Sequence, residues 1–187
     1  MKKLFVIIVL TFFASTAIAA ESTAWKIISE KSKLNFKVQQ DKSDIVGYFK
    51  KFDGQINFDK DQLDKSKVII DIDTSSIVIS LTEAQSAIQG SEWLSTKAFP
   101  KATFSAAKFV LLKDKKTYRA DGDLTIKSRT FPISLDFTFN EYSATKANAT
   151  GKTHIQRSVF TVGNSDIKKA NNVSDDVEVT FSITATK

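Results

Sequence analysis

Residues 131–139 read Phe-Pro-Ile-Ser-Leu-Asp-Phe-Thr-Phe, and this stretch decides the fold. Its odd positions are all large and apolar, whereas its even positions are proline, serine, aspartate and threonine. Such alternation is typical of a half-buried β-strand. Residues 33–38, 118–126 and 177–183 alternate in the same way, and shorter cases are 55–58, 68–73, 103–111, 146–154 and 159–162. The chain therefore predicts an all-β, mostly antiparallel sheet with one dry and one wet face.

Turns and one helix complete the predicted elements. Turn signals lie at Phe52-Asp-Gly54, at residues 113–116 and at Asn140-Glu141, between neighbouring strands as hairpins require. Ser80-Leu-Thr-Glu83 matches a capping box, and apolar residues then recur at helical spacing as far as Gly90. We expect one short helix near residues 81–90. At this point a two-sheet sandwich and a closed barrel both fit the pattern.

The N-terminus has the pattern of an export signal. Two lysines precede an apolar run, and an Ala-x-Ala triplet ends at Ala19, so we expect residues 1–19 to be cleaved as a signal peptide. An uncleaved N-terminal anchor is the alternative. The mature chain, residues 20–187, is then a single domain with a net charge of 25 − 21 = +4. Since the chain has no cysteine to acylate, it is expected free in the periplasm or secreted. No other segment is apolar for long enough to span a membrane as a helix.

Residues for catalysis, metal binding or nucleic-acid binding are scarce. His154 is the single histidine, whereas a metal site needs three or four ligands, and no cysteine is present. Asp71 and Asp73 share one wet strand face and are read as solvated acids. The lysines of residues 113–116 and 168–169 are interleaved with acids, which is not the pattern of a nucleic-acid-binding protein. The sequence therefore predicts no cofactor, no metal, no catalytic residues and no nucleic-acid partner.

Large aromatic residues are unusually frequent. Of the fifteen phenylalanines, twelve remain after the signal peptide, together with Trp25 and Trp93. They either fill a solid two-sheet core or line a cavity, since eight strands are about the smallest number whose barrel holds a ligand. Composition alone leaves the two readings open.

Several ordered motifs resemble the YceI-like family. Residues 47–59, from Gly47-Tyr-Phe to Ile56-Asn-Phe-Asp, are similar to that family's glycine- and phenylalanine-rich stretch, and further matches follow at 73–77, 93–104, 122–130, 157–163 and 173–179. The resemblance covers Trp25 to the C-terminus. It implies an extended, lipocalin-like antiparallel β-barrel of about eight strands with a short helix. It also implies an exported protein that binds polyisoprenoids or similar long amphipathic lipids in an apolar tunnel.

The candidate ligand-binding residues are inward-facing positions within these motifs, with Arg157 as the first candidate to meet a lipid head group and Trp93 and Tyr118 as second contacts. The full set is Phe49, Phe52, Phe58, Ile77, Trp93, Phe104, Tyr118, Leu124, Phe137, Phe139, Arg157, Phe160 and Phe181. For Arg157 the alternative is an ion pair with Asp175 or Asp176.

Three function classes stay open on this sequence. The favoured one is a periplasmic carrier or reservoir of lipid. The others are a solidly packed stress or interaction protein, and an enzyme acting on such a lipid through His154. The sequence leaves the oligomeric state open, a homodimer included.

Overall fold

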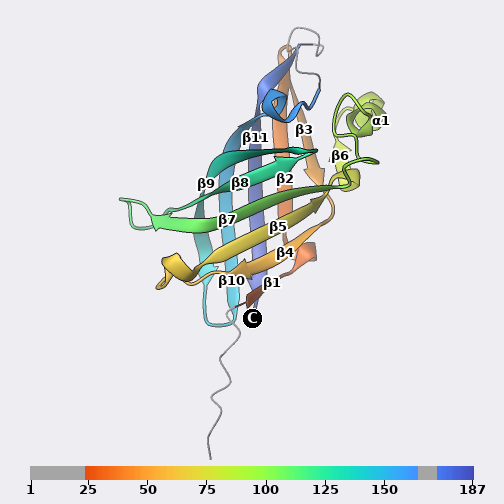
Figure 1. Ribbon diagram of the computed structural model, residues 1–187. Coiled ribbons are helices and arrows are strands. Elements are labelled where there is room, and N and C mark those ends of the chain that lie inside the picture. The colour runs from red at the N-terminus through yellow and green to blue at the C-terminus, as the bar shows by residue number, and fades with distance from the viewer. Residues whose placement is uncertain (1–23, 164–171) are drawn as a thin grey trace, which may run out of the picture.

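The computed structural model describes residues 24–163 and 172–187, and the signal peptide expected at 1–19 lies outside them (Figure 1). All strands of the described part belong to one antiparallel sheet. They are β1 Ala24–Ile27, β2 Lys33–Gln40, β3 Ser43–Phe49, β4 Phe52–Asn57, β5 Lys67–Asp73, β6 Ile77–Ile79, β7 Lys101–Leu111, β8 Tyr118–Ile126, β9 Arg129–Tyr142, β10 Lys146–Gln156 and β11 Val173–Thr186.

Eight of these strands close a barrel. Their order is β1-β4-β5-β7-β8-β9-β10-β11, and β11 returns to β1 through the pairs Lys26↔Thr186 and Ile27↔Ala185. A closed ring leaves no unpaired backbone along its circumference, which is how barrels avoid exposed edges. The predicted all-β antiparallel barrel of about eight strands is therefore confirmed.

The sheet continues beyond the ring as β2, β3 and β6. The long strand β11 pairs with β1 at its C-terminal end and with β2 over the rest of its length, and β3 and β6 follow in that order. The far edge of β6 is occupied by a side chain. The amide of Gln85 accepts from the N–H of Ile79 and donates to the carbonyl of Ile77, at 3.1 and 2.9 Å. This amide takes the place of a further strand and blocks edge-to-edge pairing.

The helix is shorter than predicted. A 3₁₀ turn, Thr82–Ala84, precedes α1, Gln85–Gln89, beside β6 (Figure 1). The capping box is wrong, because the Ser80 hydroxyl accepts from the N–H of Val46, at 3.2 Å, and no side-chain cap bonds to the start of the 3₁₀ turn. Ser80 thus extends the β3–β6 pairing instead of starting a helix.

Three other local predictions are corrected. Residues 52–54, read as a turn, lie in β4, where Gly54 packs closely on β5: a Cβ there would stand 2.2 Å from the carbonyl oxygen of Ile69. Residues 159–162, read as a strand, belong to the 3₁₀ turn Arg157–Phe160 and the turn after it. The Asn140-Glu141 turn also lies within a strand, β9, so that chain reversal comes slightly later.

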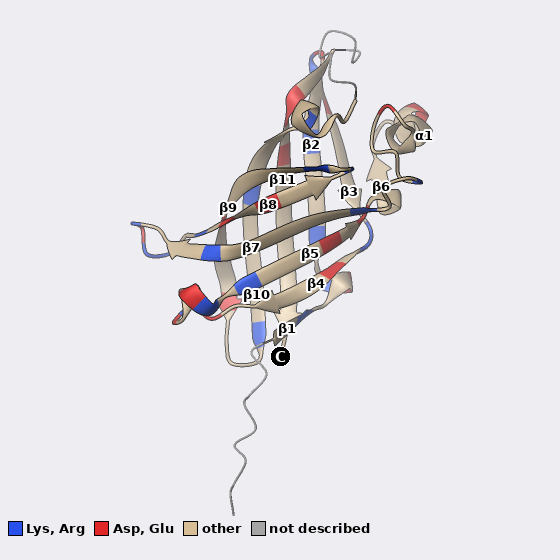
Figure 2. Cartoon of the chain, in the orientation of Figure 1, with Lys and Arg blue, Asp and Glu red and all other residues tan. Residues whose placement is uncertain are grey.

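Apolar and charged side chains separate across the sheet as the alternation predicts. The described core includes Phe104, Leu124 and Phe137, each at most 8% exposed. Lysines, arginines and acids lie along the strands in mixed order (Figure 2), with outward pairs such as Arg119–Asp136 and Lys101–Asp71. Among the described residues no helix is both long and apolar enough to cross a membrane.

Candidate functional site

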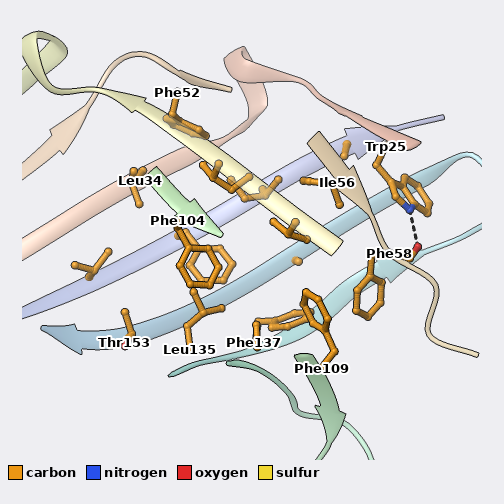
Figure 3. Close-up of a pocket in the computed structure, with 18 of the residues that line it drawn as sticks. Trp25, Leu34, Phe52, Ile56, Phe58, Phe104, Phe109, Leu135, Phe137 and Thr153 are labelled. Carbon is orange, nitrogen blue, oxygen red and sulfur yellow. Dashed lines mark hydrogen bonds between the residues drawn. The ribbon is translucent and has the colours of Figure 1, made fainter. Parts of the chain in front are cut away.

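The barrel encloses an apolar cavity of about 190 Å³ (Figure 3). All eight strands of the ring and β2 contribute to its wall. The lining residues are Trp25, Leu34, Phe52, Ile56, Phe58, Val68, Ile70, Ile72, Phe104, Phe109, Ala120, Leu124, Ile133, Leu135, Phe137, Phe139, Tyr142, Ala147, Ala149, Thr153, Ile155, Val179, Phe181, Ile183 and Ala185.

Strand periodicity explains this wall. Side chains two residues apart share a face, so β11 contributes Val179, Phe181 and Ile183 to the interior while the residues between them face outward. Small residues keep the interior open where strands meet. Gly151 of β10 pairs with Phe137 on one side and Phe181 on the other, and a Cβ there would stand 2.6 Å from the Phe181 ring. The missing side chain at Gly151 therefore makes room for a lining phenylalanine.

Aromatic rings gather around Phe58 in the cavity lining. Its ring centroid lies 5.4 Å from Phe109, 5.3 Å from Phe139 and 6.3 Å from Tyr142. Most of these ring pairs are edge-to-face, the arrangement that aromatic quadrupoles favour. Trp25 stands next to them, as Figure 3 shows, and its ring faces Tyr142 at 5.4 Å. The Lys187 ammonium covers Trp25, 4.7 Å from the ring centroid.

The polar atoms of the lining residues already have partners. The carbonyl oxygen of Phe58 accepts from Trp25 Nε1 at 2.9 Å and from the Tyr142 hydroxyl at 3.4 Å. Burial raises the pKa of Tyr142, so that hydroxyl stays protonated. The Thr153 hydroxyl donates to the Ser134 carbonyl at 2.9 Å. Across the described chain, no fully buried side-chain nitrogen or oxygen lacks a partner. The cavity therefore offers carbon surface to a ligand, and no free hydrogen-bonding group.

The structure brings seven of the thirteen predicted site residues together in this lining. They are Phe52, Phe58, Phe104, Leu124, Phe137, Phe139 and Phe181. Tyr118 lies beside this lining on the same face of the sheet, where its ring stacks on Phe137 at 5.6 Å. Phe49 packs against Phe36 at 5.8 Å, and Ile77 is buried in β6, beyond the ring.

The remaining three predicted residues lie outside the cavity lining, in a group that we call the Arg157 cluster, made of Arg157, Trp93, Phe160 and Gly163. The guanidinium carbon of Arg157 lies 5.5 Å from the centroid of the Trp93 ring. Phe160 is 1% exposed and meets Phe131 edge-to-face at 5.3 Å. Gly163 has a φ of +77°, and a Cβ there would stand 2.6 Å from the Trp93 ring. Only glycine suits that conformation and that contact.

Arg157 is 4% exposed and donates to backbone carbonyls. Nε donates to Ser174 at 2.9 Å, Nη2 to Val173 at 2.8 Å, and Nη1 to Val162 and Gly163 at 2.8 and 3.0 Å. Burial lowers the pKa of Arg157, and the charge of Asp175 opposes that shift. The guanidinium thus fastens the turn after β10 to the start of β11.

The observed contacts of Arg157 differ from both of its expected roles. With four N–H groups used on carbonyls, the side chain is not arranged to meet a head group at a cavity mouth. The alternative ion pair is also not what the described residues contain. Asp175 accepts from the N–H and hydroxyl of Ser158, and Asp176 lies 2.9 Å from Nδ1 of His154.

The other polar candidates lie on the outer surface. His154 has a side chain 53% exposed and faces Asp176 and Glu178, while its neighbours Thr153 and Ile155 line the cavity. The carboxylate of Asp71 accepts from Lys101 and Thr103, and these bonds lower its pKa. Within residues 24–163 and 172–187, no group of three or more His, Asp or Glu side chains is arranged to hold a metal ion.

Many lining residues were not among the predicted site residues, although their signal was present. Ile133, Leu135, Val179 and Ile183 belong to the clearest alternating runs, but the predicted set was drawn only from aromatic or motif positions. Ala147 and Ala149 face inward too, and their small side chains give no sign of this in a sequence. The period-two rule applied to every strand would have found most of the wall.

Several known proteins resemble this chain in sequence. The model of the YceI-like domain matches residues 25–185. Protein YceI of Escherichia coli O6:H1 is 33% identical over 130 residues, which cover 68% of this chain and 65%, just under two thirds, of that protein. A UPF0312 protein of Vibrio cholerae serotype O1 is 27% identical over 168 residues, 86% of this chain and 88% of its own length.

Solved structures share the fold. The crystal structure of Burkholderia cenocepacia BcnA is 26% identical and superposes with a TM-score of 0.77, covering 84% of this chain and 98% of BcnA. The Campylobacter jejuni YCEI protein is 23% identical with a TM-score of 0.64, covering 75% of this chain and 84% of that one. A polyisoprenoid binding domain from Saccharophagus degradans, implicated in plant cell wall breakdown, is 14% identical with a TM-score of 0.67, covering 87% and 97%.

Proposed function

This chain belongs to the YceI-like family, and from that premise we propose that it is a carrier or reservoir of long-chain amphipathic lipids. The ligand class we propose is the polyisoprenoids, with the apolar tail held in the barrel cavity. The observation that carries the proposal is the cavity wall of carbon, in which every polar atom of the lining is already hydrogen-bonded.

The energetics of such a wall favour long tails. Each methylene transferred from water gains about 0.8 kcal/mol, whereas association costs on the order of 4–15 kcal/mol before affinity appears. A single five-carbon unit therefore binds negligibly, and a tail several times longer binds well. Because the lining offers no donor or acceptor, it discriminates poorly between tails of similar length and shape. The head group stays outside the cavity, where water and surface groups solvate it.

We also propose that the protein works in the periplasm. The export pattern of residues 1–19 and the absence of cysteine support an unlipidated, exported product. A mobile carrier or reservoir is of most use in an aqueous compartment between two membranes, since a long isoprenoid tail does not cross water unaided.

Native mass spectrometry of protein purified without detergent from its own host tests the proposal. We expect a bound mass that an organic extract identifies as a long-chain lipid. Ala149→Phe places a ring inside the cavity and should strip most of that mass, while Ala107→Phe, on the exposed face of β7, should leave it unchanged. A ligand-free mass in every preparation, with no lipid in the extract, would sink the carrier reading and favour a solidly packed interaction protein.

A further inference from the structure

The β7–β8 hairpin projects beyond the barrel (Figure 1). Its tip exposes apolar side chains. Val110 is 38% exposed and Leu111 45%. Adjacent strand residues point to opposite faces, so both faces of the tip carry an uncovered aliphatic side chain. Pairing with β5 ends at Ala106, and from Lys108 onward the described partner of β7 is β8 alone. The hairpin tip, residues 110–116, is therefore presented to the surroundings.

The turn of this hairpin concentrates positive charge. Lys113, Lys115 and Lys116 are all exposed, and no ion pair joins them to an acid of the described chain (Figure 2). The one acid among them, Asp114, is engaged within the turn. Its carboxylate accepts from the backbone N–H groups of Lys116 and Thr117 and from the Thr117 hydroxyl. These bonds, the hydroxyl's first, lower the pKa of Asp114 to about 2 and fix the turn.

We propose that this tip docks the protein on an anionic phospholipid bilayer, with the three turn lysines among the phosphates and the aliphatic side chains of Val110 and Leu111, just before the turn, at the headgroup boundary. Aliphatic side chains flanked by lysines suit that boundary, because they gain from leaving water where the cations gain from the surface potential. The tip also continues the cavity wall. Phe109, just before Val110, lines the cavity, and Tyr118, paired with Leu111, stacks on the lining residue Phe137.

A second exposed apolar pair shows why the charge matters. Val46 and Tyr48 of β3 are 49% and 43% exposed, on the outer face of the sheet. The lysine beside them, Lys37, lies within 4 Å of both Asp44 and Glu178. Lys37, which pairs with Val46 across β2 and β3, is thus engaged with acids, unlike the hairpin lysines, so this apolar pair serves as an internal control.

Sedimentation with vesicles tests the docking, on protein purified from cells that express the full chain. The vesicles contain phosphatidylglycerol and phosphatidylethanolamine, with phosphatidylcholine vesicles as the neutral comparison. A lysine near an anionic surface contributes roughly fivefold in affinity, so K113Q/K115Q/K116Q should weaken binding on the order of 100-fold. V110T/L111T should weaken it on the order of 10-fold. Wild-type binding should weaken with added salt.

Matched variants carry the same chemical changes elsewhere. K42Q/K50Q/K51Q removes three other exposed lysines, and V46T/Y48T removes the other apolar pair. Both should bind vesicles like wild type, and circular dichroism checks that all four variants are folded. Wild type that ignores anionic vesicles, or controls that lose as much as the hairpin variants, would overturn the docking. So would loss in the lysine variant alone, which would assign the tip to a soluble polyanion.

The docking deepens the proposed lipid carrier, yet its failure is separable. The bound mass in native mass spectrometry reports on the cavity, and sedimentation reports on the tip. Protein that holds lipid but ignores vesicles refutes the docking alone. Protein that binds vesicles through residues 110–116 but never holds lipid refutes the carrier alone.

Discussion

Two regions of this barrel bury polar groups beside aromatic rings, and they satisfy the hydrogen bonds of those groups in different ways. Around the cavity, the indole of Trp25 and the hydroxyl of Tyr142 share a single acceptor, the Phe58 carbonyl, and the remaining surface is carbon around an open space. In the Arg157 cluster, one guanidinium donates to four carbonyls and is covered by Trp93. Both regions bury aromatic rings and satisfy every polar atom, but only the first leaves room for a ligand.

The difference shows that satisfied polar groups do not by themselves mark a binding site. The few polar side-chain atoms of the lining bond to backbone carbonyls. The cavity therefore has no free polar group that would hold water in place of an apolar tail. In the Arg157 cluster, the guanidinium connects residues 162–163 to residues 173–174, which β-sheet hydrogen bonds do not join. This difference supports the proposal that ligand binds in the first region, and it gives the second region a role in stability.

Replacing Arg157 is the strongest test of that assignment. Arg157→Gln leaves several buried carbonyls without donors, each costing about 1–3 kcal/mol; with relaxation, we expect the free energy of unfolding to fall by about 3–5 kcal/mol. Urea unfolding measures the loss. Arg119→Gln makes the same change on the outer face, where the side chain is 42% exposed, and should cost no more than about 1 kcal/mol.

A loss of bound lipid without a loss of stability would contradict the contrast between the cavity and the Arg157 cluster. If folded Arg157→Gln protein keeps wild-type stability and loses its bound lipid instead, Arg157 belongs to the ligand site and the cluster is not merely structural. Rescue by Arg157→Lys separates charge from geometry. A lysine restores the cation but not the planar fork that reaches four carbonyls, so we expect only partial recovery of stability.

Enlarging a small side chain distinguishes the cavity from the packed core. The expected effect on stability is smaller than that of Arg157→Gln. Ala149 lines the cavity, while Ala102, on the face of β7 that carries Phe104, is 6% exposed and lies outside the lining. Ala102→Leu should lower the free energy of unfolding by about 1–3 kcal/mol, because a filled interior has no space for it. Ala149→Leu should cost about 1 kcal/mol or less. Thermal and urea unfolding measure both variants. If the two variants lose equal stability, the cavity does not accept added atoms.

Strand periodicity predicted the fold better than it predicted the site. The runs at 131–139 and 177–183 gave two strands with the correct inward faces. Strand β3 was missed because Val46 and Tyr48 are exposed apolar residues, which hide the alternation of Ser43–Phe49. The capping box failed for a tertiary reason, since the hydroxyl of Ser80 bonds to β3, far away in sequence.

The site was predictable as an inward surface and not as a cavity. Alternation identifies which side chains face inward, but it does not tell whether the space between them is filled. Phe160 and Phe137 look alike in sequence, yet Phe160 packs on Phe131 and Phe137 faces the cavity. The contacts of Arg157 could not be predicted from the sequence for a related reason. Its partners are backbone carbonyls, and a backbone acceptor leaves no trace in residue identity.

The smallest expected effect concerns the outer arginine that contrasts with Arg157. Arg119 donates to Asp136 from Nε and Nη2 at 2.7 and 2.8 Å, and these bonds lower the pKa of Asp136. A carboxyl whose pKa is lower in the folded state binds more protons when unfolded, so it stabilises the fold above its ordinary pKa of about 3.9. That contribution is lost as the pH falls through the folded-state value.

Asp136→Asn should therefore cost less than about 1 kcal/mol near neutral pH, since both side chains are roughly two-fifths exposed. Urea unfolding over a pH series should show the gap between wild type and variant closing in acid and shrinking with salt. A gap that stays constant in acid would contradict the ion-pair origin. The cost of Arg157→Gln should change far less over the same series, because backbone carbonyls do not titrate. An acid-sensitive cost at Arg157 would instead indicate that a carboxylate, with Asp175 the nearest candidate, supports the guanidinium more than the carbonyls do.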